Sequence, residues 1–246
     1  HPTGPFRLTQ LGTFPSGYPQ PESKEDIHAD LYLFIFARPF GGSKSPILAS
    51  ASSISYDATS NGRPYAGFVH VNFATLKTSS EGESQTSKSR DFFETALHEI
   101  THALGFSEPL YKEFYNKKTG DKYGDDLPFY KCYNNSYKNQ RFKILATPKL
   151  HEVTAKMFGQ ETLDLINAKT QETSCPIGAI IEDEGGDGTA GSHFELLTHM
   201  NEIMVGMTIG HRSSISVLTL AFLEDTGWYS VDYSKAEPYY YGNYQA

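Results

Sequence analysis

The feature that most constrains the fold is a His-Glu-x-x-His pattern at residues 98–102. Residues four apart stand on one face of an α-helix, so His98 and His102 can share one metal ion if this stretch is helical. Glu99, between them, can then serve as a general base. Gly105 follows shortly after the second histidine, where helices commonly end in a left-handed residue. The pattern therefore requires a helix that carries both imidazoles on one face.

The surrounding residues favour such a helix. Four apolar residues recur at helical spacing, namely Phe93, Leu97, Ile100 and Leu104. Ile100 lies about 200° around the helix from His98, so the histidines point away from the apolar stripe. Asp91, with Glu94 three residues later, resembles a capping box. We therefore predict a helix over roughly residues 90–104, with one face for packing and the other for chemistry.

Composition narrows the class of protein. The 246 residues suit one large domain or two lobes, and at 38% hydrophobic they can bury a core. The formal net charge of −8 gives no support to a nucleic-acid partner, because nucleic acids select a basic face. No apolar run approaches the roughly 20 residues that span a bilayer. Membrane attachment is therefore expected only through an anchor outside this sequence.

Two features point to an oxidising compartment. Cys132 and Cys175 are the two cysteines, and a disulfide between them would contribute about 4 kcal/mol by restricting the unfolded chain. Two buried free thiols are the alternative. Asn134 begins an Asn-Asn-Ser glycosylation sequon. Together these features indicate an extracellular, cell-surface or secretory-pathway protein.

Three stretches ahead of the motif are predicted strands. Residues 30–37 form a near-continuous apolar run, typical of a strand buried on both faces. Residues 47–54 are rich in small polar side chains, which indicates an edge strand, and residues 66–73 form the third strand. His70 in the third strand is expected to be an ordinary buried histidine and not a metal ligand.

The second half of the chain shows weaker patterns. Residues 107–148 contain many Tyr, Lys and Asn residues and are interpreted as an irregular insertion. Helical spacing of apolar residues returns after residue 148, again near 161–168, and most strongly over 213–225. This half is therefore expected to be mainly irregular or helical.

A catalytic zinc usually has three protein ligands and leaves its fourth position open. Six side chains downstream of the motif are candidates for the third ligand: His151, His193, His199, His211, Glu195 and Glu202. His193 follows a glycine-rich loop, which would let the backbone bring its imidazole to the metal. That argument alone leaves the other candidates open.

Three segments carry a resemblance to a known family. Residues 98–107 read His-Glu-Ile-Thr-His-Ala-Leu-Gly-Phe-Ser, residues 191–193 read Gly-Ser-His, and residues 201–204 read Asn-Glu-Ile-Met. Together they resemble the zinc-binding pattern and Met-turn of the leishmanolysin family of metzincin metallopeptidases. The resemblance extends from about residue 30 to residue 237.

The resemblance implies an α+β fold. Residues 1–105 would form the upper part of a metzincin catalytic domain, a twisted mixed sheet with the active-site helix. Residues 106–246 would form a lower, mainly irregular or helical lobe with the Met-turn. Family catalytic domains begin further upstream, so the upper part is expected to lack their first strands and to associate with a missing N-terminal fragment.

The resemblance also implies a zinc-dependent endopeptidase that acts on proteins or peptides. One Zn²⁺ ion would be bound by His98, His102 and His193. His199, the main rival, would be a polar surface residue near the Met-turn. Glu99 would be the general base, and Met204 would pack beneath the metal.

Two other functions are kept as alternatives. One is a catalytically inactive binding or adhesion module with the same fold, which the intact motif disfavours. The other is a different zinc hydrolase in which Glu195 or Glu202 is the third ligand. For the peptidase, an extended substrate is expected to pair with the edge strand at 47–54.

Overall fold

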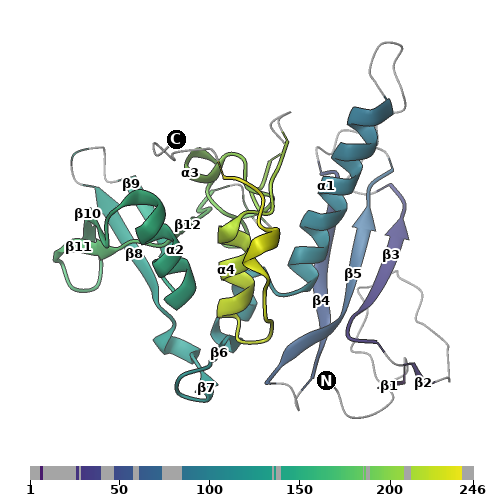
Figure 1. Ribbon diagram of the computed structural model, residues 1–246, viewed down its shortest axis with the longest axis horizontal. Coiled ribbons are helices and arrows are strands. Elements are labelled where there is room, and N and C mark those ends of the chain that lie inside the picture. Colours follow the sequence, from purple (N-terminus) through teal and green to yellow (C-terminus); the bar gives the residue numbers. More distant parts are fainter. Residues whose placement is uncertain are drawn as a thin grey trace. The chain divides into compact units, whose positions relative to one another are not determined.

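The chain forms two compact units in the computed structural model, His1–Gly105 and Phe106–Ala246 (Figure 1). The structure describes residues 6–7, 26–27, 29–39, 47–57, 61–73, 85–134, 136, 140–184, 186, 189–207 and 212–239. Each unit has its own sheet, and the mixture of sheets and helices confirms the predicted α+β class. Among the helices in these ranges, none combines the length and the apolarity needed to cross a membrane.

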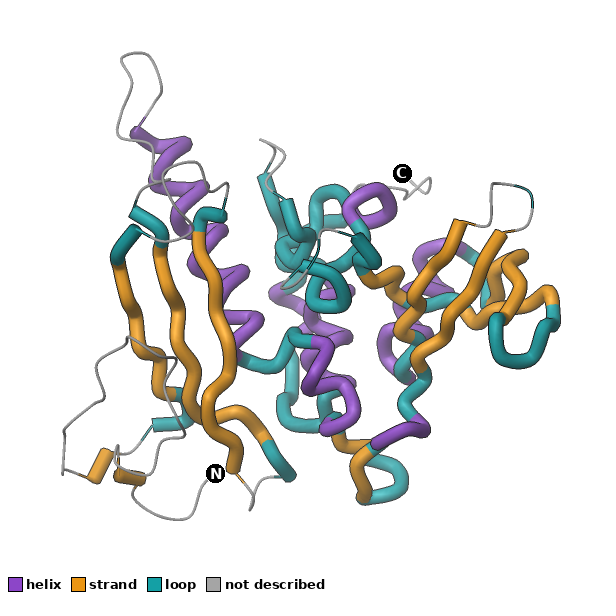
Figure 2. The backbone as a smooth tube through the Cα atoms, turned by 180° about the vertical axis from the view of Figure 1, so that it is seen from behind, coloured by secondary structure: helices purple, strands orange, loops and turns teal. Residues whose placement is uncertain are grey.

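The first unit is built on a three-stranded sheet (Figure 2), in which the strand order is β3–β5–β4 (Figure 1). Its central strand β5 (Arg63–Val71) pairs in parallel with β3 (Tyr32–Ala37) and antiparallel with β4 (Ala49–Asp57). A short antiparallel ladder joins β1 (Phe6–Arg7) to β2 (Asp26–Ile27). All three strands predicted ahead of the motif are therefore present, with shifted ends.

One expectation about these strands is wrong. The run at 30–37 was expected to be buried on both faces, yet one face of β3 is exposed at its end, where Ile35 is 70% exposed, while Phe34 and Phe36 on the other face are partly buried. An apolar run alone does not show that both faces of a strand are covered. The edge position of β4 and the ordinary burial of His70 are both confirmed, the latter with its Nε2 atom 3.2 Å from the Arg38 carbonyl oxygen.

Helix α1 (Gln85–Ala103) carries the motif and packs against β4 and β5. It begins earlier than predicted, so Asp91 lies within it, and the Asp91 carbonyl oxygen accepts a hydrogen bond from the side-chain hydroxyl of Thr95, one turn later, at 2.8 Å. The predicted capping box is therefore wrong. Gly67 of β5 allows the close approach of the helix, because a Cβ there would lie 2.9 Å from the Cβ of Ala103.

The second unit contains a five-stranded antiparallel sheet in the order β11–β10–β8–β9–β12. Its strands are β8 (Phe129–Asn134), β9 (Gln140–Leu145), β10 (Thr162–Asn167), β11 (Thr173–Pro176) and β12 (Ala179–Ile181). The sheet corrects two expectations, because residues 107–148 are not irregular and residues 161–168 are a strand. A six-residue run fits both periodicities, and only its neighbours on the sheet decide between them.

Short helices complete the second unit. They are α2 (Pro148–Phe158), α3 (Leu196–His199), α4 (Val217–Asp225) and the 3-10 turns η3 (Glu108–Glu113), η4 (Gly124–Asp126) and η5 (Tyr233–Lys235), with a small ladder of β6 (Tyr115–Asn116) and β7 (Asp121–Lys122). The predicted helix after 148 is confirmed, and the helix predicted over 213–225 is present but begins at Val217. The Asp225 carboxylate accepts hydrogen bonds from the backbone amides of Lys149 and Leu150, so the end of α4 caps the start of α2.

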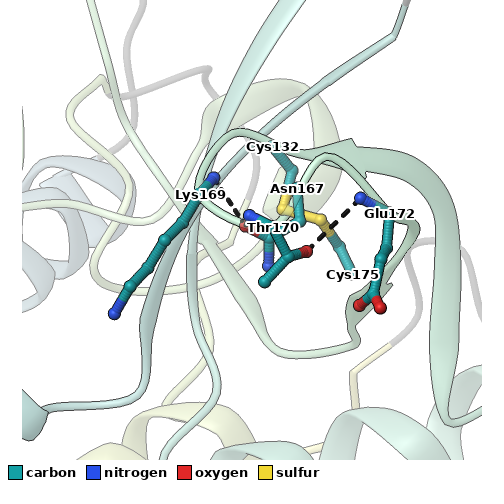
Figure 3. The surroundings of a disulfide bond; sticks show 6 residues. All are labelled: Cys132, Asn167, Lys169, Thr170, Glu172 and Cys175. Carbon is teal, nitrogen blue, oxygen red and sulfur yellow. Dashed lines mark hydrogen bonds between the residues drawn. A yellow bond between two sulfur atoms is a disulfide. The ribbon is translucent and has the colours of Figure 1, made fainter.

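A disulfide joins Cys132 of β8 to Cys175 of β11 (Figure 3). Strand β10 lies between these two strands, so the bond ties three neighbouring strands together. Both sulfurs belong to a buried apolar cluster with Ile144 and Leu165. The predicted bridge is therefore confirmed. Asn134 ends β8, and its glycosylation stays a prediction.

Removing the disulfide should destabilise the protein. We expect the double variant Cys132→Ala, Cys175→Ala to lose about 4 kcal/mol of unfolding free energy, because the open chain regains its loop-closure entropy. Urea denaturation of the oxidised wild type and the variant measures the difference. Adding reductant should lower the stability of the wild type and leave that of the variant unchanged; equal stability of the two oxidised proteins would contradict the prediction.

Candidate metal centre

Helix α1 places the two motif histidines one turn apart. The Nε2 atoms of His98 and His102 are 3.0 Å apart, with the ring planes inclined at 80°. Two nitrogens bound to one tetrahedral zinc at its usual bond length are about 3.3–3.4 Å apart. A small rotation of either ring therefore gives the separation that a shared zinc ion requires, and the pair fits that ion.

The last turn of α1 is held from both sides. The Ala103 carbonyl oxygen accepts a hydrogen bond from Ser53 Oγ on β4 at 3.0 Å. Gly105 has a φ of 128°, which L residues rarely adopt, and its amide donates to the His102 carbonyl oxygen at 3.0 Å. The predicted role of Gly105 at the helix end is confirmed, and it fixes the turn that carries His102.

Glu99, which lies between the two histidines in the sequence, is buried. The residue is 5% exposed, and its Oε2 atom has no hydrogen-bond partner among the residues that the structure describes. Burial raises the pKa of Glu99 to about 8. A buried carboxylate without a partner is costly, so this oxygen suits a site where a cation or a polar ligand binds.

In the second unit, His193 is oriented by a backbone carbonyl. Its Nδ1 atom lies 2.9 Å from the Thr189 carbonyl oxygen. With the proton on Nδ1, the Nε2 atom carries the lone pair that binds a metal, which is the usual arrangement for metal-binding histidines. The ring is buried, and this burial lowers the pKa of His193, so the neutral form is favoured.

The His193 segment is held in place by two contacts that sequence reasoning missed. Gly191 has a φ of 81°, and its carbonyl oxygen accepts a hydrogen bond from the buried Tyr111 hydroxyl at 2.8 Å. The Glu108 amide donates to Ser192 Oγ at 3.3 Å. Both partners come from η3, roughly eighty residues earlier in the chain, so no local pattern could reveal them.

The predicted Met-turn runs beside the His193 segment. Met204 is fully buried, and its carbonyl oxygen accepts a hydrogen bond from the Phe194 amide at 2.8 Å. The backbone at Gly206 also lies close to the His193 segment, because a Cβ at Gly206 would lie 2.7 Å from the Thr189 side chain. Met204 is thus a packing residue of this unit, as expected, while its place beneath a metal stays a prediction.

The histidine that follows, His199, is not the polar surface residue expected from the sequence. It is 1% exposed, its Nε2 accepts a hydrogen bond from the Ile180 amide at 3.1 Å, and its Nδ1 lies 3.2 Å from the Tyr239 hydroxyl. The Tyr239 hydroxyl donates to the Thr198 carbonyl oxygen at 2.9 Å, so Nδ1 of the neutral ring donates to Tyr239. Both ring nitrogens therefore have structural partners within this unit.

Glu202, another candidate ligand, also has hydrogen-bond partners within the second unit. Its carboxylate accepts hydrogen bonds from Thr219 Oγ1 at 2.5 Å, from the Ile203 amide at 3.0 Å, and from both the amide and the hydroxyl of Ser216. Burial raises the pKa of Glu202. These bonds attach the Met-turn to the start of α4 and leave the carboxylate inside the core.

The other candidates also have local partners. Glu195 caps α3 by accepting a hydrogen bond from the Leu197 amide at 3.2 Å. His151 lies between the Ile177 carbonyl oxygen at 2.7 Å and the Glu161 carboxylate at 2.9 Å. His211 lies outside the described residues.

Comparisons with known proteins point to one family. The profile of the leishmanolysin family matches residues 18–246. A leishmanolysin-like peptidase of Caenorhabditis briggsae is 30% identical over 241 residues, covering 87% of this chain and 33% of the relative. A ciliated left-right organizer metallopeptidase of Xenopus laevis is 28% identical (82% and 25% covered), and leishmanolysin of Leishmania major is 25% identical (85% and 28% covered). The chain spans about a third or less of the length of these curated relatives.

The burial of His199 should make stability depend on pH. Burial lowers its pKa to about 3, so between that value and about 6.5 the unfolded state binds more protons than the folded state. Stability is therefore lost as the pH falls through this window, and we expect about 2 kcal/mol of loss from this group between pH 7 and pH 5. Urea denaturation of the EDTA-treated wild type and His199→Gln measures it. The variant should lose correspondingly less unfolding free energy on acidification. Parallel curves of unfolding free energy against pH for the two proteins would contradict the prediction.

Proposed function

The chain belongs to the leishmanolysin family of metallopeptidases, and we propose on this basis that it is a zinc-dependent endopeptidase with Glu99 as its general base. The observation that carries the proposal is the last part of α1. Two imidazole nitrogens lie 3.0 Å apart there, and the carboxylate of Glu99, between them in sequence, has one buried oxygen without a hydrogen-bond partner in the described part of the chain. Few structural roles need that combination, whereas metal-assisted hydrolysis needs all of it.

In this proposal, His98, His102 and His193 hold one Zn²⁺ ion. Support for the first two is their spacing on α1. Support for His193 is the contact between its Nδ1 and the Thr189 carbonyl oxygen, because metal-binding histidines commonly donate their other ring proton to such a partner. The competing candidates support it as well, since both nitrogens of His199 and both oxygens of Glu202 have partners in their own unit.

The chemistry follows from these roles. A bound zinc ion would polarise the scissile carbonyl and lower the pKa of the attacking water. Glu99 would accept a proton from that water at a carboxylate oxygen and then donate it to the leaving amine. Its pKa of about 8 reflects burial alone, and a cation nearby favours the charged carboxylate, which is the form that accepts a proton. The proposed substrates are proteins or peptides, as membership of a peptidase family implies.

We also propose that the protein works outside the cytosol, on the cell surface, in the secretory pathway or beyond the cell. The disulfide between Cys132 and Cys175 supports this location, because such bonds persist in oxidising compartments. The sequon at Asn134 is consistent with it.

Replacing the proposed base separates catalysis from metal binding. Glu99→Gln should reduce peptide hydrolysis by about 10²–10⁴-fold, because the amide cannot accept the proton. Its zinc content should match that of the wild type, since no ligand is removed. Turnover of a casein-type substrate and metal analysis measure the two quantities. Activity near the wild-type level would refute the mechanism, and an inactive wild type that binds zinc would favour the alternative of a binding module.

The third ligand is tested by metal retention. His193→Ala should lose most of its zinc on dialysis, because only two imidazoles remain, while its secondary structure by circular dichroism stays unchanged. His151→Ala is the control, since it removes another histidine of the second unit, one whose two ring nitrogens have partners within that unit. Stoichiometric zinc in dialysed His193→Ala would overturn the assignment.

A further inference from the structure

A pocket of about 470 Å³ lies on the five-stranded sheet of the second unit. Its lining includes Lys131, Tyr133, Arg141, Lys143, Ala168 and Asp183. None of these residues has a role in the proposed zinc centre. The pocket is within the usual size range of ligand sites, large enough for side chains of a bound peptide.

The strand register gathers positive charge on one face of the sheet. Lys131 of β8 is directly opposite Lys143 of β9, and Tyr133 is directly opposite Arg141. Because side chains alternate along a strand, these four share one face. Cys132, between them along β8, belongs to the other face, where it joins the buried apolar cluster around the disulfide. One face of this strand pair is therefore core, and the other is cationic.

The positive charges are only partly balanced. Lys143 forms an ion pair with Asp183 at 2.8 Å. Lys131 and Arg141 are exposed, and neither has an ion-pair partner in the part of the chain that the structure describes. Like charges directly opposite one another on neighbouring strands destabilise a sheet. Two uncompensated cations on one face, one of them within this cross-strand lysine pair and the other beside it, indicate a binding role in a chain of formal net charge −8.

We propose that this pocket binds acidic segments of the proteins that the chain cleaves, an inference that rests on the proposed peptidase function. Carboxylates match both the fork of an Arg guanidinium and the point charge of a Lys. Strands β8 and β9 each have neighbours on both sides, so an added strand cannot pair with them and recognition is by side chains. A compact pocket on an acidic protein is a poor match for the long, uniformly charged backbone of a nucleic acid.

Such a site raises the efficiency of cleavage without touching the reacting bond. An acidic segment held in the pocket increases the effective concentration of the rest of the same substrate. Acidic proteins would therefore show a lower KM than neutral ones, with kcat little changed. Short neutral peptides would be cleaved at the same rate whether or not the pocket is intact.

The test compares two double variants with the same change in charge. K131E/R141E alters the pocket, and K118E/K156E alters two exposed lysines outside it. Fluorescence anisotropy measures binding of a labelled oligoglutamate peptide and of its oligoglutamine match to the zinc-loaded proteins. We expect the wild type to bind oligoglutamate about tenfold more tightly than oligoglutamine, and K131E/R141E to lose that difference. K118E/K156E should retain it, and added salt should weaken it.

Equal binding of the two peptides by the wild type would overturn the proposal, and so would undiminished oligoglutamate binding by K131E/R141E. Binding of a sulfated oligosaccharide with no binding of oligoglutamate would overturn it in favour of a different anion. Hydrolysis of a short neutral peptide is measured in parallel. If hydrolysis is absent while glutamate-selective binding persists, the peptidase assignment fails and the carboxylate site stands. If hydrolysis is present without selective binding, the pocket proposal alone fails.

Discussion

The carboxylate of Glu202 receives hydrogen bonds from Ser216 and Thr219 at the start of α4 and from the backbone of Ile203, while none of it reaches solvent. An uncompensated carboxylate at such a depth would cost several kcal/mol, so these donors must remain in position for the unit to fold. They fix the turn that contains Met204, and the backbone of Met204 pairs with Phe194, next to His193. The position of the proposed third ligand therefore depends on an acid that never meets the metal.

A comparable constraint acts on the first unit. Gly67 lets the end of α1 lie directly on β5, and Ser53 holds the Ala103 carbonyl oxygen. A larger residue at Gly67 would push the helix away by meeting both Ala103 and the Ser52 carbonyl oxygen, each at 2.9 Å. In each unit, buried contacts fix the position of the backbone, and the backbone in turn positions the imidazole side chains.

Local sequence patterns predicted the features that depend on residues close to one another in the chain. The helix with His98, Glu99 and His102, the glycine after it, the three strands ahead of it and the disulfide could all be found from spacing and residue type. The strand β10 could not, because its short apolar run fits a helix equally well until β8 and β11 pair with it. The burial of His199 could not either, because its partners Ile180 and Tyr239 lie 19 and 40 residues away. The support that Tyr111 gives to Gly191 is more distant still, and the choice of His193 as a ligand stays a proposal.

The disulfide has a consequence for a protein surrounded by peptidase activity. It closes a covalent ring that contains β9, α2 and β10, together with the exposed turn after Asn167. A peptide bond cut within that turn would open the ring and leave a single covalently connected molecule. The strands on either side would also stay paired in the sheet, with the cationic face intact on β8 and β9. The two pieces produced by self-digestion at this turn would thus separate from each other only after reduction of the disulfide.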